Sequence, residues 1–490
     1  MRELLRLDGV SRPALWLVMG RAIGFLAAFF VPLVLVRLFD PAAFGTYKQL
    51  FLIYGTLYGV AQLGVAESLY YFVPRNPSDA GRHAMNAVVT LAVVGLGCMA
   101  LLGAAAGDIA RWLTNPQLAD TLVLLGGFLA LMLVSALFEI VLVSRQQYKT
   151  AAYAYGASEV LRTALILVPA IAFGGLRGVL WGAIAFATVR VIAMLWTLGR
   201  DLGTTLRPSL RLWRHQWIYT LPFALAGGVE VVQANVHNYV VASRFDAATF
   251  AVYAVGCLQI PLVDVLTTSS ANVMMVKMAE EGFESRGPAA LALWHDTMGR
   301  LALVIFPLAA FLLVMAKDII VVHFTSTYLA SVPIFMLWTL AIVFSVPCVD
   351  GVLRAHAQMR FLFGLNVLRL GVVLGLTGWF LSIYGLPGAV LVTLLATGLA
   401  RVAGIARIAR LLGVGFSAVL PWKHLATTAL YSAVAAAPAF WFARAASLPR
   451  PLVLLCAAAI YGATYAALCY GLSKAPVSAA PVPALQKIPS

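Results

Sequence analysis

The stretch Phe39-Asp-Pro-Ala-Ala-Phe-Gly-Thr-Tyr47 follows one long apolar segment and opens into another. Nearly the same residues return as Phe245-Asp-Ala-Ala-Thr-Phe-Ala-Val-Tyr253, at a constant offset of 206 positions. Asp followed by Pro or Ala is typical of a helix start. Aromatic rings suit the headgroup level of a membrane, where one end is wet and the other apolar, so we expect them there. The repetition indicates an internal duplication.

Composition points to a membrane protein. Hydrophobic residues make up 62% of the 490 positions and charged residues only 11%, against about 25% in soluble domains. Apolar segments of about 20 residues recur along the whole chain, which leaves no room for a soluble domain. The net charge of +15 does not indicate nucleic acid here, because the basic residues sort by membrane side. The five cysteines lie inside apolar segments and have neither metal-ligand spacing nor a disulfide pattern.

The apolar segments predict an all-α polytopic fold with about fourteen transmembrane helices. Their predicted ranges are 14–38, 48–73, 84–107, 121–144, 150–173, 176–198, 216–242, 249–275, 298–323, 328–352, 361–383, 386–408, 424–443 and 450–472. Residues 473–490 are rich in Pro and Ala and predict a disordered tail.

Orientation follows from the distribution of Lys and Arg. If the N-terminus is cytoplasmic, 21 basic residues fall in cytoplasmic segments and 8 in outside segments. This asymmetry predicts that both termini are cytoplasmic. The N-terminal run is longer than a signal peptide and carries Arg21, so we expect it to be retained as the first helix.

A second match supports the duplication. Gln147-Tyr-Lys149 and Val160-Leu-Arg162 in the fifth segment resemble Gln358-Met-Arg360 and Val367-Leu-Arg369 in the eleventh, with a four-residue difference in spacing. We therefore expect two parallel six-helix repeats around a central cavity, followed by two additional helices. The predicted units are 1–198, a cytoplasmic linker at 199–215, 216–408, 424–472 and the tail.

Polar side chains inside the segments are the candidate substrate-binding residues, because an ionisable group in a membrane is costly unless it is paired or lines water. Glu230, Gln233 and His237 share one helical face. We expect a wet, cationic cavity formed by Arg21, Arg162, Glu230, Gln233, His237, Asn238, Asp264 and Arg369. We find no pattern typical of a catalytic, metal-binding or cofactor site.

Each candidate also has a structural interpretation. Glu159 and Arg162 lie three residues apart and would form a pair on one helix face. Arg190 and Arg401, two turns from the cytoplasmic ends, are expected to extend to the membrane interface, and Arg21 has the same alternative. The polar face at 230–237 would alternatively bond to neighbouring helices.

The stretch at 37–47, together with Leu63-Gly-Val-Ala-Glu-Ser-Leu69 and Tyr70-Tyr-Phe-Val-Pro74, resembles the polysaccharide (O-antigen-type) flippases. That family belongs to the multidrug/oligosaccharidyl-lipid/polysaccharide exporter superfamily. Leu221-Pro-Phe-Ala-Leu225 and the second copy at 245–253 carry the same resemblance. The similarity covers most of residues 12–410. The second copy departs from the pattern with Ala251 in place of Gly45, which weakens its turn signal.

The resemblance implies a flippase rather than an enzyme, acting by alternating access in the bacterial cytoplasmic membrane without a cofactor. Its cargo would be a polyprenyl-diphosphate-linked oligosaccharide, a repeat unit of a polysaccharide or O-antigen. Arg and His would neutralise the diphosphate, and Gln, Asn and Tyr would bond the sugars. The implied partners are membrane lipids, H⁺ or Na⁺ as a coupling ion, and the polymerase and glycosyltransferases of the pathway.

Three alternatives stay open at this point. A peptidoglycan-precursor flippase also has fourteen helices and a cationic cavity. A drug/cation antiporter of the same superfamily usually has twelve helices and acidic sites, which fits less well. A membrane polysaccharide polymerase would need a large outside loop, and no predicted outside loop exceeds about 15 residues.

Overall fold

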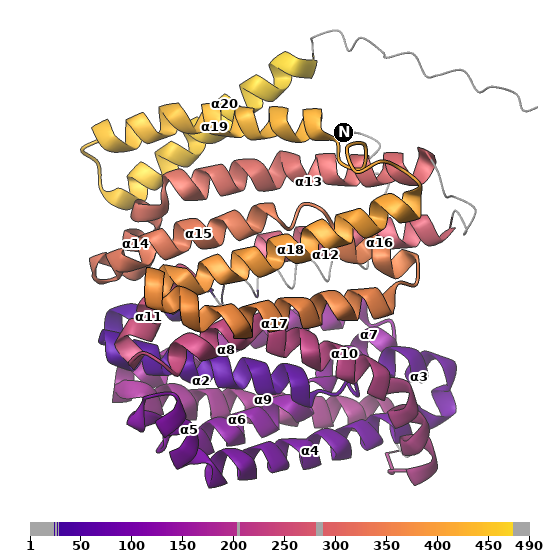
Figure 1. Ribbon diagram of the computed structural model, residues 1–490. Helices are drawn as coiled ribbons and strands as arrows, with labels where there is room; N and C mark the ends of the chain where they lie inside the picture. Colours follow the sequence, from indigo (N-terminus) through magenta and orange to yellow (C-terminus); the bar gives the residue numbers. More distant parts are fainter. Residues whose placement is uncertain (1–23, 25–26, 28, 203–205, 281–287, 474–490) are drawn as a thin grey trace, which may run out of the picture.

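The computed structural model describes residues 24, 27, 29–202, 206–280 and 288–473, and every regular element among them is a helix (Figure 1). The chain is built in consecutive layers. Helices of the first half lie on one side, those of the second half beside them, and α19 and α20 on the far side of the second half (Figure 1). This arrangement confirms the all-α polytopic class.

The helices of the first half follow a short helical segment at Phe29–Leu38. They are α2 (Pro41–Ala61), α3 (Leu69–Arg75), α4 (Ala80–Ala104), α5 (Ala106–Trp112), α6 (Leu122–Ser135), α7 (Leu137–Ser144), α8 (Tyr148–Phe173) and α9 (Gly175–Leu202).

The helices of the second half repeat this order. They are α10 (Leu210–Ala242), α11 (Ala247–Gly256), α12 (Pro261–Glu280), α13 (Pro288–Val314), α14 (Ala316–Phe324), α15 (Val332–Val343), α16 (Val349–Ala355), α17 (Met359–Tyr384) and α18 (Leu386–Leu412). The last two helices are α19 (Trp422–Ala445) and α20 (Arg450–Ser473).

The repeated Asp starts a helix in both halves. Asp40 and Asp246 have nearly the same backbone angles, φ −65° and ψ 166° or 168°. Each carboxylate accepts a hydrogen bond from a backbone N–H of the first turn, Ala43 at 2.7 Å and Thr249 at 2.8 Å. These side chains satisfy N–H groups that would otherwise lack a partner, which is why the chain turns into a helix here.

Four aromatic residues of the repeated stretch are buried in the protein, and their expected place at the headgroup level of a membrane stays a prediction. Phe44, Tyr47, Phe250 and Tyr253 are all buried, with at most 7% of their surface exposed. These rings fill the space where the first turns of α2 and α11 pack against their neighbours.

Backbone geometry supports the duplication independently of the motif. Left-handed residues recur at the same junctions in both halves: Thr114 and Thr325, Gln146 and Ala357, and Gly174 and Gly385. Each pair is separated by 211 positions. Helices α8 and α17 have 26 residues each, and their first residues, Tyr148 and Met359, are also 211 positions apart. Two repeats with equivalent turns in the same order are what a parallel duplication produces.

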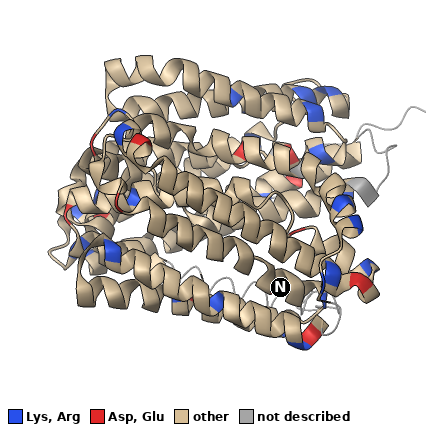
Figure 2. Cartoon of the chain, turned by 90° about the horizontal axis from the view of Figure 1, so that it is seen from below, with Lys and Arg blue, Asp and Glu red and all other residues tan. Residues whose placement is uncertain are grey.

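Ten helices in the described ranges are long and apolar enough to cross a membrane, and the bent pair α11–α12 makes eleven. Lys and Arg gather toward the helix ends, with long uncharged stretches between them (Figure 2). The protein is therefore a multi-pass membrane protein. The predicted count of fourteen stays a prediction, because residues 1–23 are outside the described part.

Helices α19 and α20 form a hairpin that packs on the second half. Tyr465 donates a hydrogen bond to the Leu303 carbonyl of α13 at 3.1 Å, and Trp294 of α13 donates one to the Val419 carbonyl at 2.9 Å. These bonds attach the hairpin to one half only, as expected for an addition to a twelve-helix core.

Candidate functional site

A cavity of about 320 Å³ lies inside the second half. Helices α10, α12, α15, α17 and α18 and the break between α11 and α12 form its wall. Its polar lining consists of Gln233, His237, Gln259, Asp264, Ser345, Arg369, Thr393, Thr397 and Arg401. The volume falls within the range of small-ligand pockets.

Helix α10 places two of the predicted residues in this cavity. Gln233 and His237 lie one turn apart and are 4% and 3% exposed. The Nδ1 atom of His237 is 2.7 Å from the Tyr253 hydroxyl, which fixes the ring. Glu230 is exposed and Asn238 is half-buried, and neither lines the cavity. The structure thus brings part of the predicted face of α10 to the cavity.

Arg369 is the cation that this cavity leaves without a carboxylate. Its Nη2 atom lies 3.5 Å from the Thr397 hydroxyl, at the limit of a hydrogen bond, and its Nε–H is buried without a partner. Arg369 forms no ion pair with any described carboxylate. A buried N–H group without an acceptor is costly unless an anion or a water molecule accepts its hydrogen bond.

A helix break borders the cavity on another side. Helix α11 ends at Gly256 and α12 begins at Pro261, bent by 51° from α11. Residues 258–260 of the break line the cavity, and Asp264 follows in the first turn of α12. Asp264 is exposed and forms no ion pair within the described residues. The cavity therefore combines one unpaired Arg with one unpaired carboxylate.

Two equivalent ion pairs occupy the two halves. Arg190 of α9 pairs with Glu139 of α7, and Arg401 of α18 pairs with Asp350 of α16 at 3.6 Å. Arg401 lies 211 positions after Arg190 in the sequence, and Asp350 lies 211 positions after Glu139. The first pair is buried, with side chains 12% and 3% exposed, whereas Asp350 is 48% exposed.

The expectation that Arg190 and Arg401 extend to the membrane interface is therefore wrong. Each finds a carboxylate on a neighbouring helix that compensates its charge, and only the pair of Arg190 is buried. In the second half the pair is longer and more open, and Arg401 also lines the cavity beside Arg369.

Arg162 lies elsewhere. It pairs with Glu159 on its own helix, α8, at 2.6 Å, as its structural interpretation predicted, and it does not line the cavity that contains Arg369. Counted from equivalent helix starts, Arg162 is residue 15 of α8 and Arg369 is residue 11 of α17. The two arginines are thus one turn out of register rather than at matching positions. Arg21 lies outside the described residues.

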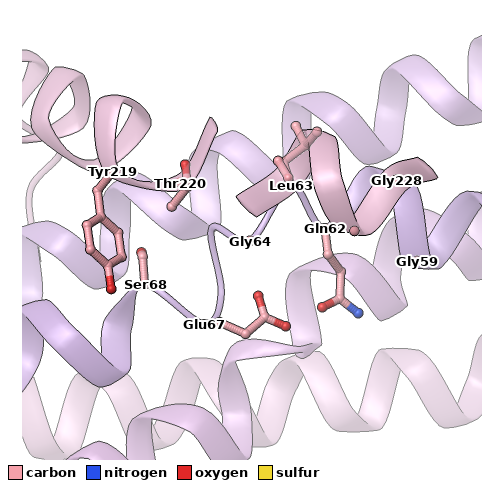
Figure 3. A pocket seen from close by; sticks show the side chains of 11 residues that line it. Gly59, Gln62, Leu63, Gly64, Glu67, Ser68, Tyr219, Thr220 and Gly228 are labelled. Atoms are coloured by element: carbon pink, nitrogen blue, oxygen red, sulfur yellow. The ribbon is translucent and has the colours of Figure 1, made fainter. Parts of the chain in front are cut away.

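A second cavity, of about 380 Å³, lies between α10 and the break that separates α2 from α3 (Figure 3). At the break Leu63 and Gly64 adopt left-handed angles, φ 51° and 63°. Gln62 and Glu67 extend into the space, and Ser68, Tyr219 and Thr220 line it (Figure 3). Gln216 of α10 donates a hydrogen bond to the Ser68 hydroxyl at 2.8 Å, which ties α10 to the break.

Sequence reasoning missed this second cavity. One signal was present: Gly64 lies inside a predicted span, whereas Gly227 and Gly228 lie within the unbroken helix α10. Glycine within an apolar run is compatible with irregular backbone, which is tolerated at membrane depth where it lines a cavity. Among the described residues, no group of three His, Cys, Asp or Glu side chains could hold a metal ion.

The sequence profile of the family described as "Polysaccharide biosynthesis protein" matches residues 34–333, more than half of the chain. The chain belongs to this family. No curated protein sequence matches it. The family match confirms the resemblance drawn from the stretch at 37–47.

Solved transporters share the fold. The lipid II flippase MurJ in an inward closed conformation superposes with a TM-score of 0.70 at 12% identity, covering 94% of this chain and 99% of that protein. An inward-facing multidrug resistance MATE family transporter of the MOP superfamily gives 0.61 at 15%, covering 81% and 95%. A MOP superfamily transporter from Pyrococcus furiosus gives 0.60 at 15%, covering 82% and 95%.

These comparisons place the chain in the polysaccharide-biosynthesis family and give it a fold that solved transporters share. At 12–15% identity the superpositions establish the fold alone. The residues of the two cavities must therefore decide what this chain carries.

Proposed function

We propose that the protein is a flippase that moves a polyprenyl-diphosphate-linked oligosaccharide across the bacterial cytoplasmic membrane by alternating access. The observation that carries the proposal is Arg369, a half-buried arginine whose Nε–H is buried without a partner and which lines a cavity of about 320 Å³. A diphosphate offers planar, bidentate anionic groups that match such a donor.

The neighbours of Arg369 suit the same cargo. Arg401 adds a second guanidinium whose ion pair with Asp350 is already 3.6 Å long. Gln233, Thr393 and Thr397 offer amide and hydroxyl groups to the remaining phosphate oxygens. The polyprenyl tail stays in the lipid, so the protein has to compensate only the headgroup.

The alternative of a peptidoglycan-precursor flippase uses the same chemistry, since its cargo is also a lipid diphosphate with sugars. The structural similarity to MurJ supports this second candidate. A drug/cation antiporter fits less well, because Arg369 and Arg401 would repel a cationic substrate. Asp264, a carboxylate without an ion-pair partner in the described part of the chain, is our candidate for a coupling H⁺ or Na⁺.

The direct test is Arg369→Ala. We expect surface polysaccharide to be lost while the protein stays in the membrane at normal abundance. Removing a charge-assisted contact of about 1.5–3 kcal/mol should weaken binding of undecaprenyl diphosphate by about tenfold to a hundredfold. Arg369→Lys should recover part of the loss, because it keeps the charge without the planar fork.

The matched control is Arg354→Ala, which removes an exposed guanidinium of α16 outside the cavity. It should leave both measurements unchanged. Normal polysaccharide in Arg369→Ala would refute the proposal, and so would an equal loss in the Arg354 variant.

A further inference from the structure

Another cavity, of about 520 Å³, lies between α4 and the first turns of α10, and we call it the α4–α10 groove. Val89 and Val93 line it from α4, and Leu210, Trp213 and Trp217 line it from α10. On each helix these residues are three or four positions apart, so they form one apolar stripe. The groove is open to the outside of the bundle, since Val93 is 64% and Leu210 is 80% exposed. An apolar hollow of this kind on a membrane protein marks a site of contact with lipid.

The polar residues in the wall of the groove are already hydrogen-bonded. The Asn86 amide donates to the Ser209 carbonyl at 3.1 Å and accepts from the Ser209 N–H at 2.8 Å. The Trp213 Nε1–H donates to the Thr90 hydroxyl at 3.0 Å. The Nε1–H of Trp217 is buried, so this ring presents carbon to the groove. These bonds attach the start of α10 to α4 (Figure 1) and leave a surface that suits hydrocarbon.

Arginines border the groove at the end where α10 begins. Arg214 lies one turn from both Leu210 and Trp217, and Arg211 lies one turn before Arg214. Arg207 stands just before the helix. All three arginines are exposed, and none of them forms an ion pair with a carboxylate in the described part of the chain. Three uncompensated positive charges therefore lie beside an apolar groove.

Both helices change from charged to apolar in the same direction. No Asp, Glu, Lys or Arg occurs in α10 between Arg214 and Glu230. On α4 the charged residue Arg82 is followed by exposed apolar residues, among them Val93 and Leu96. This order is typical of helices that pass from the headgroup level of a membrane into its hydrocarbon. A ligand with an anionic head and a hydrocarbon chain matches both parts of the groove.

We propose that the α4–α10 groove binds one anionic phospholipid of the surrounding bilayer. Its phosphate lies at Arg211 and Arg214, because guanidinium groups suit phosphate oxygens. One acyl chain lies along Val93 and Trp217. Basic side chains beside a cavity between membrane helices are suited to anionic headgroups.

The occupant differs from the proposed cargo. None of the residues that line the α4–α10 groove lines the arginine cavity, so the inference does not depend on a diphosphate at Arg369. Helix α4 belongs to the first half and α10 to the second. The bound phospholipid therefore contacts both halves and adds to the hydrogen bonds that join them here.

The test uses the purified full chain in detergent micelles with equal amounts of dioleoyl phosphatidylglycerol and dioleoyl phosphatidylcholine. The two lipids have the same acyl chains and differ in the charge of the headgroup. Mass spectrometry of the intact complexes gives the ratio of the two lipids that the protein retains. We expect the wild-type protein to retain phosphatidylglycerol in about tenfold preference, the effect of one or two arginines on an anionic headgroup.

Arg211→Gln combined with Arg214→Gln should reduce this ratio to about one, because both guanidinium groups at the groove are lost. The matched control is Arg354→Gln combined with Arg360→Gln, which removes two exposed arginines of the second half that do not border the groove. Its ratio should equal that of the wild type. A preference that survives in the Arg211 and Arg214 variant would refute the site.

The place of the acyl chain is tested by Val93→Trp, which fills the groove. It should lower the amount of retained phosphatidylglycerol severalfold. The control is Val402→Trp on α18, another exposed valine, which should retain as much lipid as the wild type. Equal retention in the two variants would contradict the position of the chain between α4 and α10.

Arg369→Ala separates this inference from the proposed function, and it should leave the lipid ratio unchanged. A wild-type ratio of about one refutes the phospholipid site even when Arg369 is needed for surface polysaccharide. If undecaprenyl diphosphate displaces the retained phosphatidylglycerol from the wild type but not from Arg369→Ala, that lipid occupies the cargo cavity and the inference is wrong. A preference that depends on Arg211 and Arg214 supports the site even if Arg369→Ala makes normal polysaccharide.

Discussion

A close contact between the two halves at Gly45 predicts the effect of a single methyl group. A Cβ atom at Gly45 of α2 would lie 1.7 Å from the carbonyl oxygen of Ala247 at the start of α11. Non-bonded heavy atoms normally keep about 3.2 Å or more, so Gly45→Ala must separate the two helices by about 1.5 Å. Overpacking of this kind costs about 1–3 kcal/mol.

If the protein works by alternating access, as proposed, this cost falls on the conformation that contains the contact. A penalty of about 1–3 kcal/mol on one of two states shifts their ratio by about fivefold to more than a hundredfold. We therefore expect Gly45→Ala to populate a state in which the two halves are separated at this end. Helices α5 and α14 lie at the same end, where Thr114 bonds to the Phe245 carbonyl and Arg37 to the Val322 carbonyl.

The assay is a spin-label distance between α5 and α14. Arg111 and Lys317, both exposed, are replaced by labelled cysteines in a background without the native cysteines. Gly45→Ala should broaden this distance distribution toward longer values. The control is Gly55→Ala on the same helix, where a Cβ would meet nothing within 4 Å. Identical distributions in the two variants would refute the idea that this contact holds the halves together.

Three further predictions follow from the ion pairs, the helix caps and the topology. Arg190→Ala leaves Glu139 buried and unpaired, so it should destabilise the protein by about 3 kcal/mol. Arg401→Ala should destabilise it less, because Asp350 is 48% exposed. Thermal unfolding of the two variants in detergent compares their stabilities. Hydrogen bonds from Thr249 lower the pKa of the Asp246 carboxyl, so its capping contribution to stability is present above about pH 4 and is lost as the pH falls through that lowered pKa. Asp246→Ala should therefore lower the free energy of unfolding by about 1 kcal/mol at neutral pH and by progressively less in acid. Asp246→Asn is the control. Alkaline phosphatase fused at Ser447 should be active and at the C-terminus inactive, and activity at the C-terminus would contradict the even number of spans.

The sequence was a good guide to where the helices lie. The range 150–173 was predicted and Tyr148–Phe173 is observed; 386–408 was predicted and Leu386–Leu412 is observed. Apolar runs bounded by charge carry this information, since a spanning helix needs about 20 apolar residues. Breaks within an apolar run are harder to predict. The second span is interrupted at residues 62–68, but its apolar character continues through the break, so hydropathy does not reveal it.

The partners of buried charges were harder to predict. Glu139 and Arg190 are 51 residues apart in sequence, and their contact depends on how α7 packs beside α9. The pair Glu159 and Arg162 was foreseeable, because both lie on one helix. The substitution of Ala251 for Gly45 weakened the turn signal of the second copy, and the structure explains it differently. Gly45 has to be small because it contacts Ala247, so packing between the halves selects it rather than turn geometry.

The difference between the halves locates the function better than their similarity does. The pairs Glu139–Arg190 and Asp350–Arg401 are equivalent, so a charged contact at this level belongs to the shared scaffold. In the first half Arg162 pairs with Glu159, whereas in the second half Arg369 has no carboxylate partner among the described residues. A duplicated fold gains nothing structural from leaving a half-buried cation without a carboxylate. Under the proposed function, an anionic group of the cargo takes the place of the missing carboxylate.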